Sequence, residues 1–167
     1  MRFTSVGIAA ALTLVAVSSA LHGQRSETPV DPRSVALLQQ GRTAEAAGQF
    51  DRATDLFESA LVVDPRNRGA YVALGDVTAT RDLPGKAIRY YREALQLDPN
   101  DVRALAGQGA ALVKRGAVAR ANENLARIRQ LCADKCAESR TLAAVIAKGP
   151  PPVQAAQAVP PKPTGQN

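Results

Sequence analysis

The sequence predicts an all-α protein, a solenoid of about three helix pairs with a C-terminal capping helix. Three observations predict this fold: a 34-residue internal repeat, apolar residues at helical spacing within each repeat, and Asp-Pro pairs at the ends of repeats. The composition agrees, since 46% hydrophobic and 22% charged residues in a chain of 167 are typical of one small globular domain. With no Trp, three Phe and three Tyr, the core must rely on small and aliphatic side chains, which suits closely packed helices.

The repeat becomes visible when the chain is aligned on itself with an offset of 34 residues. Gly41, Gly75 and Gly109 fall at this spacing. The other repeated columns are Ala53, Ala87 and Ala121; Phe57, Tyr91 and Leu125; Ala60 and Ala94; and the pairs Asp64-Pro65 and Asp98-Pro99. So many coincident columns indicate three copies of one structural unit.

Each unit is predicted to contain two helices. Val35, Leu38 and Gly41 recur at helical spacing, as do the apolar residues between positions 50 and 61. Small residues such as Gly41 allow paired helices to approach closely, and the large residue at Phe57 fills the space beside that contact. The Asp-Pro pair ends the second helix, because proline disfavours a helical residue before it and cannot donate the next backbone hydrogen bond.

This pattern resembles the tetratricopeptide repeat (TPR) family, whose 34-residue unit carries a small residue, a later Ala, an aromatic, another Ala and a closing Pro at these offsets. The resemblance implies a right-handed α-solenoid with repeats at 34–67, 68–101 and 102–135. The third repeat departs from the pattern, with Ile128 where Ala is usual and Ala133 in place of Pro, as is typical of a terminal repeat. Residues 137–148 are expected to form the capping helix, which completes a TPR domain at 34–148.

The two ends of the chain have a different composition. Residues 1–20 are predicted to be an export signal, because Arg2 precedes a twelve-residue apolar run and small residues lead up to Ala20. An uncleaved membrane anchor is the alternative. Residues 21–33 form a polar linker, and residues 149–167 a disordered Pro-rich tail. We therefore expect a periplasmic or secreted bacterial protein, in contact with a membrane only if the signal is uncleaved.

Cys132 and Cys136 lie between the third repeat and the cap. In an oxidising compartment they predict a local disulfide, with about 2 kcal/mol of stabilisation in the chain-entropy treatment. A zinc site is one alternative, but the only histidine, His22, lies at the signal, so two cysteines could build such a site only across a dimer. A redox pair is the other, although the spacing is not that of thioredoxin-like C-x-x-C motifs.

Several functional classes are not expected. Without a histidine in the folded region, the usual general base and the Ser-His and Cys-His systems are excluded, so no catalytic residues, cofactor, metal or small-molecule substrate are predicted. The net charge is +6, but the 21 basic residues are spread along the chain, and the aromatic residues fall in core columns. A nucleic-acid partner is therefore not predicted.

The family resemblance implies that the stacked first helices line a concave groove that holds a peptide or a partner helix. The groove columns are occupied here by Leu38, Arg42, Glu45, Val72, Asp76, Arg103, Ala106 and Lys114. The basic residues Arg42, Arg103 and Lys114 outnumber the acidic Glu45 and Asp76, which favours an acidic partner. Family members that clamp the carboxylate end of heat-shock chaperones use a basic and amide set in these columns, of which only Arg103 clearly keeps the charge, so that ligand is not expected.

The sequence therefore predicts a non-catalytic protein-protein interaction scaffold or adaptor of the bacterial cell envelope, which binds a protein or peptide in its concave groove. The alternative is a redox accessory factor that uses the Cys132/Cys136 pair.

Overall fold

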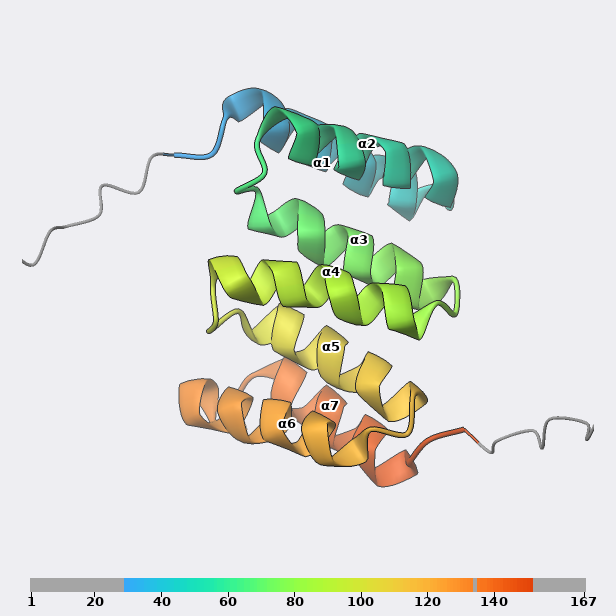
Figure 1. Cartoon of the computed structure of the whole chain (residues 1–167), viewed down its shortest axis with the longest axis vertical. Helices are drawn as coiled ribbons and strands as arrows, with labels where there is room; N and C mark the ends of the chain where they lie inside the picture. The colour runs from blue at the N-terminus through green and yellow to red at the C-terminus, as the bar shows by residue number, and fades with distance from the viewer. Residues whose placement is uncertain (1–28, 134, 152–167) are drawn as a thin grey trace, which may run out of the picture.

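The computed structural model describes residues 29–133 and 135–151, and these residues form seven α-helices. Figure 1 shows the helices stacked along one axis, with α1 and α2 at one end and α6 and α7 at the other. The helices are α1 (Pro32–Ala46), α2 (Phe50–Val63), α3 (Arg68–Thr80), α4 (Pro84–Leu97), α5 (Val102–Lys114), α6 (Val118–Cys132) and α7 (Ala137–Lys148). The predicted all-α solenoid of three helix pairs with a capping helix is confirmed. The predicted signal, residues 1–20, and most of the predicted linker and tail lie outside the described residues.

The helix ends follow from local sequence. Helix α1 begins at Pro32, two residues before the predicted start, because Asp31 caps it: Oδ1 of Asp31 accepts a hydrogen bond of 2.8 Å from the Arg33 amide. Asn67 and Asp101 cap α3 and α5 in the same way. Helices α2 and α4 end directly before Asp64 and Asp98, whose extended backbone is the conformation that a following proline favours.

The turns within the three helix pairs share one left-handed residue. Gly48 and Gly116 have φ angles of 72° and 76°, and Asp82 occupies the same column of the second repeat with a φ of 56°. Glycine adopts this conformation without steric cost, and Asp is among the few other residues that tolerate it. The repeat is therefore preserved in backbone conformation at a position where the side chain differs.

The glycine columns allow large side chains to pack against a helix backbone. Phe57 lies against Gly41 and Tyr91 against Gly75, and a Cβ atom built on Gly75 would lie 2.5 Å from the Tyr91 ring. In the third repeat the expected partner, Leu125, does not take this place. Leu142 of α7 lies over Gly109 instead, 2.7 Å from a Cβ built there. The capping helix therefore supplies a core residue of the third repeat, because α7 packs against both α5 and α6.

The contacts between helices define the curvature. Helix α1 contacts α3, and α3 contacts α5, whereas no pair of Cα atoms joins α2 to α4 or α4 to α6 within 8 Å. The first helices of the pairs therefore lie on the concave side and the second helices on the convex side. Among the described residues, no helix combines the length and apolar composition needed to span a bilayer.

Candidate functional site

The concave side is built by α1, α3 and α5, and the structure places the predicted groove residues at different depths. Arg42, Arg103 and Lys114 are exposed, and Glu45, Asp76 and Ala106 are half-buried. Leu38 and Val72 are only 6% and 4% exposed and belong to the hydrophobic core. These two side chains face the neighbouring helices, so their contact with a partner stays a prediction.

Four charged side chains from three successive first helices meet on this face, and we call them the groove cluster: Arg42, Glu45, Asp76 and Arg103. Asp76 of α3 accepts a hydrogen bond of 2.6 Å from Nη2 of Arg103 on α5. Glu45 of α1 lies within electrostatic range of the other three members. The cluster therefore connects the first, second and third repeats at the concave surface.

The groove cluster is anchored from below by Tyr91 of α4. The Tyr91 hydroxyl donates a hydrogen bond of 2.7 Å to Oδ1 of Asp76, so both carboxylate oxygens of Asp76 are engaged. Burial, together with the nearby Asp76 carboxylate, raises the pKa of Tyr91, so the phenol stays protonated and donates. This bond fixes the Asp76 carboxylate toward Arg103.

Glu45 is the carboxyl of the cluster whose charge is least stabilised. Its partial burial raises the pKa of Glu45, and the neighbouring Asp76 carboxylate adds to this effect, while Arg103 and Arg42 oppose it. A partner group that donates a hydrogen bond or carries positive charge would relieve this repulsion. Glu45 is therefore a carboxyl whose charged form would be favoured by an added positive group or hydrogen-bond donor.

The floor of the groove consists of small residues. Gly69, Ala106, Gly107 and Ala110 are all half-buried, so their backbone is reachable from the concave side. A Cβ atom on Gly107 would clash with the Tyr91 ring, and one on Gly69 would lie 2.8 Å from Leu38. These glycines are required by the side chains beneath them, and they leave a low floor that a partner backbone can approach closely.

The net charge of the groove is lower than predicted. Arg103 pairs with Asp76, and Lys114 pairs with Asp82 at 3.0 Å. Asp82 is not among the groove residues predicted from the sequence. Three cations therefore face three carboxylates in this region. Within the described part of the chain, Arg42 is the cation of the groove cluster without an ion pair or hydrogen bond, so any positive bias of the groove rests on it.

Cys132 ends α6 and Cys136 precedes α7, and their sulfur atoms lie at disulfide distance with the Cα atoms 5.9 Å apart. Both residues are half-buried against the cluster of Leu105, Ile128 and Leu142. This placement favours a staple that holds α7 on the third repeat, and the redox role stays a prediction. In the described ranges, no group of three or more His, Cys, Asp or Glu side chains could hold a metal.

Comparison with other proteins agrees with this geometry. A stretch of 70 residues, 42% of the chain, is 41% identical to cellulose synthase operon protein C of Xanthomonas axonopodis pv. citri. A stretch of 80 residues is 35% identical to the peroxisomal targeting signal receptor of Candida glabrata. The matched stretches span 5% and 14% of these much longer relatives.

Solved structures show the same fold. The TPR2B domain of yeast Sti1, in a complex with pHsp70, superposes with a TM-score of 0.64 at 19% identity, over 70% of this chain and 94% of that one. The Yersinia enterocolitica secretion chaperone SycD, in complex with a peptide of the translocator YopD, gives 0.60 at 21% identity over 68% and 92%. The first TPR domain of Spaghetti (RPAP3), bound to an HSP90 peptide, gives 0.64 at 18% identity over 70% and 91%.

Residues 37–157 match the family described as the cilia and flagella-associated protein 70 middle TPR-like domain. Because this match covers well over half of the 167 residues, the chain belongs to that family of TPR-like domains.

Proposed function

We propose that this protein is a non-catalytic scaffold or adaptor that holds a peptide or helix of another protein against α1, α3 and α5. The observation that carries the proposal is the groove cluster, in which three successive first helices present charged groups above a floor of Gly and Ala. TPR domains of the same fold have been solved with peptides of Hsp70, HSP90 and a translocator, which supports peptide binding as the mode.

The groove cluster suits an acidic partner segment through Arg42 first. This guanidinium lies within electrostatic range of Glu45 but forms no ion pair or hydrogen bond in the described residues, so it can donate to a carboxylate of the ligand without breaking an existing pair. Arg103 is held by Asp76 and would position a second group, while Glu45 accepts an N–H of the partner. Exposed charges of this kind mainly steer the encounter and are screened by salt.

The site of action that we propose is the bacterial cell envelope, reached by export and cleavage after Ala20. The signal-like composition of residues 1–20 supports this, and so does the 41% identity to a bacterial protein. Protein recovered from the envelope fraction of the exporting host is expected to begin at Leu21. Recovery with an intact Met1 would contradict the cleavage.

The experiment that tests the groove is affinity capture with cross-linking from the envelope fraction, followed by binding kinetics with the captured partner. Arg42→Glu is expected to slow association by about tenfold at low salt and to flatten the salt dependence. Ala106→Phe fills the floor and is expected to speed dissociation instead. Arg120→Glu, an exposed position on α6, is the matched charge control.

The proposal is contradicted if wild type and both groove variants bind the partner equally. It is also contradicted if only the Arg120→Glu control loses binding, because the partner would then lie outside the concave groove. All variants should keep the helical circular dichroism of the wild type, because Arg42 and Arg120 are exposed and Ala106 is only half-buried at the concave surface.

A further inference from the structure

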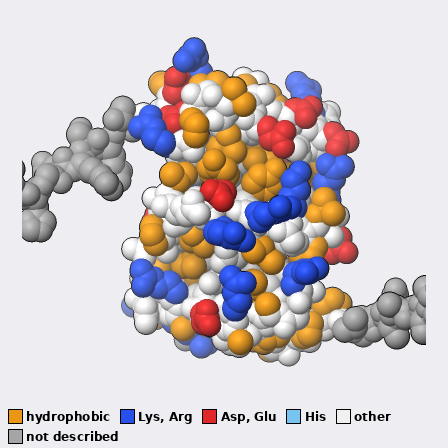
Figure 2. Space-filling view, viewed as in Figure 1, with side chains coloured by type: hydrophobic (Ala, Val, Ile, Leu, Met, Phe, Trp, Pro, Cys, Tyr) orange, Lys and Arg blue, Asp and Glu red, His pale blue; other side chains and the backbone are white. Residues whose placement is uncertain are grey.

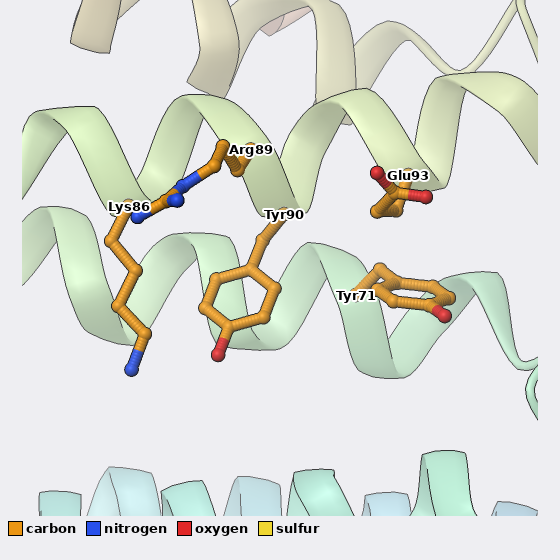
Figure 3. Close-up of a pocket in the computed structure, with 5 residues that line it drawn as sticks. All are labelled: Tyr71, Lys86, Arg89, Tyr90 and Glu93. Atoms are coloured by element: carbon orange, nitrogen blue, oxygen red, sulfur yellow. The ribbon is translucent and has the colours of Figure 1, made fainter.

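The convex side carries a hollow that the groove does not use. It has a volume of about 250 Å³ and is lined by Tyr71 of α3 and by Lys86, Arg89, Tyr90 and Glu93 of α4. In Figure 3 the Tyr90 ring lies between Lys86 and Tyr71, the Tyr71 hydroxyl points away from Tyr90, and Glu93 lies above Tyr71. Neither tyrosine is fully buried, so part of each ring is reachable from solvent.

The walls of the hollow combine apolar and hydrogen-bonding surface. Tyr71 and Tyr90 are half-buried, and their inner edges pack against the cores of the first two repeats. The Tyr90 hydroxyl lies 3.5 Å from a carboxylate oxygen of Glu58 on α2, at the outer limit of a hydrogen bond. Tyr and Arg are the residue types that contribute most binding energy at protein interfaces, because they offer large contact area with a polar end.

Lys86 and Arg89 place two positive charges on the lining of the hollow, and Glu93, above Tyr71, places one negative charge there. Lys86 and Arg89 are exposed, and in the described residues neither forms an ion pair or a hydrogen bond; Lys86 instead lies 5.5 Å from the centre of the Tyr90 ring. Figure 2 shows Lys and Arg side chains gathered across the middle of this face, beside hydrophobic side chains. A ligand with carboxylates would supply the missing partners of both cations.

We propose that this hollow is a second docking site, independent of the concave groove, for an acidic peptide segment that carries one large apolar side chain. The apolar side chain lies between Tyr71 and Tyr90, and flanking carboxylates of the peptide pair with Lys86 and Arg89.

The neighbouring charges argue against broader anionic partners. Helix α2, on the other side of the hollow, exposes Asp51, Asp55 and Glu58. A flat anionic membrane or a nucleic acid that reached Lys86 and Arg89 would also meet these carboxylates, whereas a narrow peptide can avoid them. The chain's own residues 152–167 contain Lys162 and no Asp or Glu, so they do not match these two cations.

The test is selection from a random-sequence peptide library on the full-length chain, with counter-selection against the Arg89→Glu variant. The enriched peptides are expected to combine one large apolar residue with neighbouring acids. Affinity for the best peptide should fall about tenfold in Arg89→Glu and in Tyr71→Ala. It should be unchanged in Arg120→Glu, which makes the same charge change on α6, and in Arg42→Glu, which alters the concave groove.

Arg89 is exposed, so its variant keeps the test valid even if Tyr71→Ala destabilises the second repeat; melting curves followed by circular dichroism check both. Failure to enrich any acidic-apolar peptide, or equal affinity of the Arg89→Glu variant and the wild type, would overturn the proposal. Binding to phosphatidylglycerol vesicles that depends on Arg89, without peptide enrichment, would assign the surface to a membrane and overturn it as well. Because Arg42→Glu affects only the groove, failure here is distinguishable from failure of the concave site.

Discussion

Replacement of Leu142 by Ala tests whether the capping helix completes the third repeat. Leu142 is 1% exposed and packs over Gly109, where α5 has no side chain to fill the space that the substitution leaves. Leu→Ala substitutions in cores cost about 2–5 kcal/mol, with the larger values where the surroundings cannot collapse. Since the backbone of α5 forms one wall of the new cavity, we expect a loss of about 3–4 kcal/mol in the free energy of unfolding.

The assay is urea unfolding followed by circular dichroism, with Leu97→Ala as the control. The control makes the same chemical change on α4, where the side chain is 44% exposed, so its loss should be about 1 kcal/mol or less. A loss of about 3 kcal/mol corresponds to a melting temperature lower by roughly 10 °C for a domain of this size. If Leu142→Ala costs no more than the control, α7 is only a peripheral cover and the packing argument fails.

Three further predictions follow from single contacts. Gly75→Ala should destabilise the protein by about 1–3 kcal/mol, because the new methyl group meets the Tyr91 ring. Gly85→Ala, in open space on α4, should instead stabilise it by about 0.5–1 kcal/mol. Thermal unfolding measures both, and equal effects would refute the close contact at Gly75. The Arg66 guanidinium, with two backbone amides, lowers the pKa of Asp64 from 3.8 to about 2. This carboxylate therefore stabilises the fold above about pH 4, and its contribution is lost as the pH falls through 2. Acid unfolding of the wild type and of Asp64→Asn should differ between these two pH values. Replacing both Cys132 and Cys136 by Ser should cost about 2 kcal/mol while leaving the helical spectrum intact, and two free thiols in freshly isolated protein would contradict the bond.

Much of the fold was predictable because its signals are local. A proline disfavours a helical residue before it wherever the chain is placed, so the ends of α2 and α4 could be read from Asp64-Pro65 and Asp98-Pro99. The 34-residue spacing likewise located the close approach at Gly41 and Gly75, where only glycine leaves room for an aromatic ring. Repetition multiplies such local signals, which is why the helix pairs could be predicted.

The candidate site was predicted less completely, because depth and pairing depend on how the repeats stack. Family columns placed Leu38 and Val72 in the groove, but in the structure both side chains pack in the hydrophobic core. The pair of Lys114 with Asp82 joins residues 32 positions apart, and no local pattern marks which carboxylate a flexible lysine will reach. Its effect is to lower the charge of the groove that was expected to attract an acidic partner.

The sequence by itself determined the repeat length, the ends of α2 and α4 and the glycine columns, since each depends on steric rules within a few residues. Only the tertiary structure decided that Leu142 fills the third repeat, that Arg103 is held by Asp76 and Tyr91, and that two tyrosines line a hollow on the convex side. These arrangements depend on packing between helices that are far apart in the chain. Residues in the same repeat column can pack against different neighbours there, because small differences in side-chain size decide which neighbour fits.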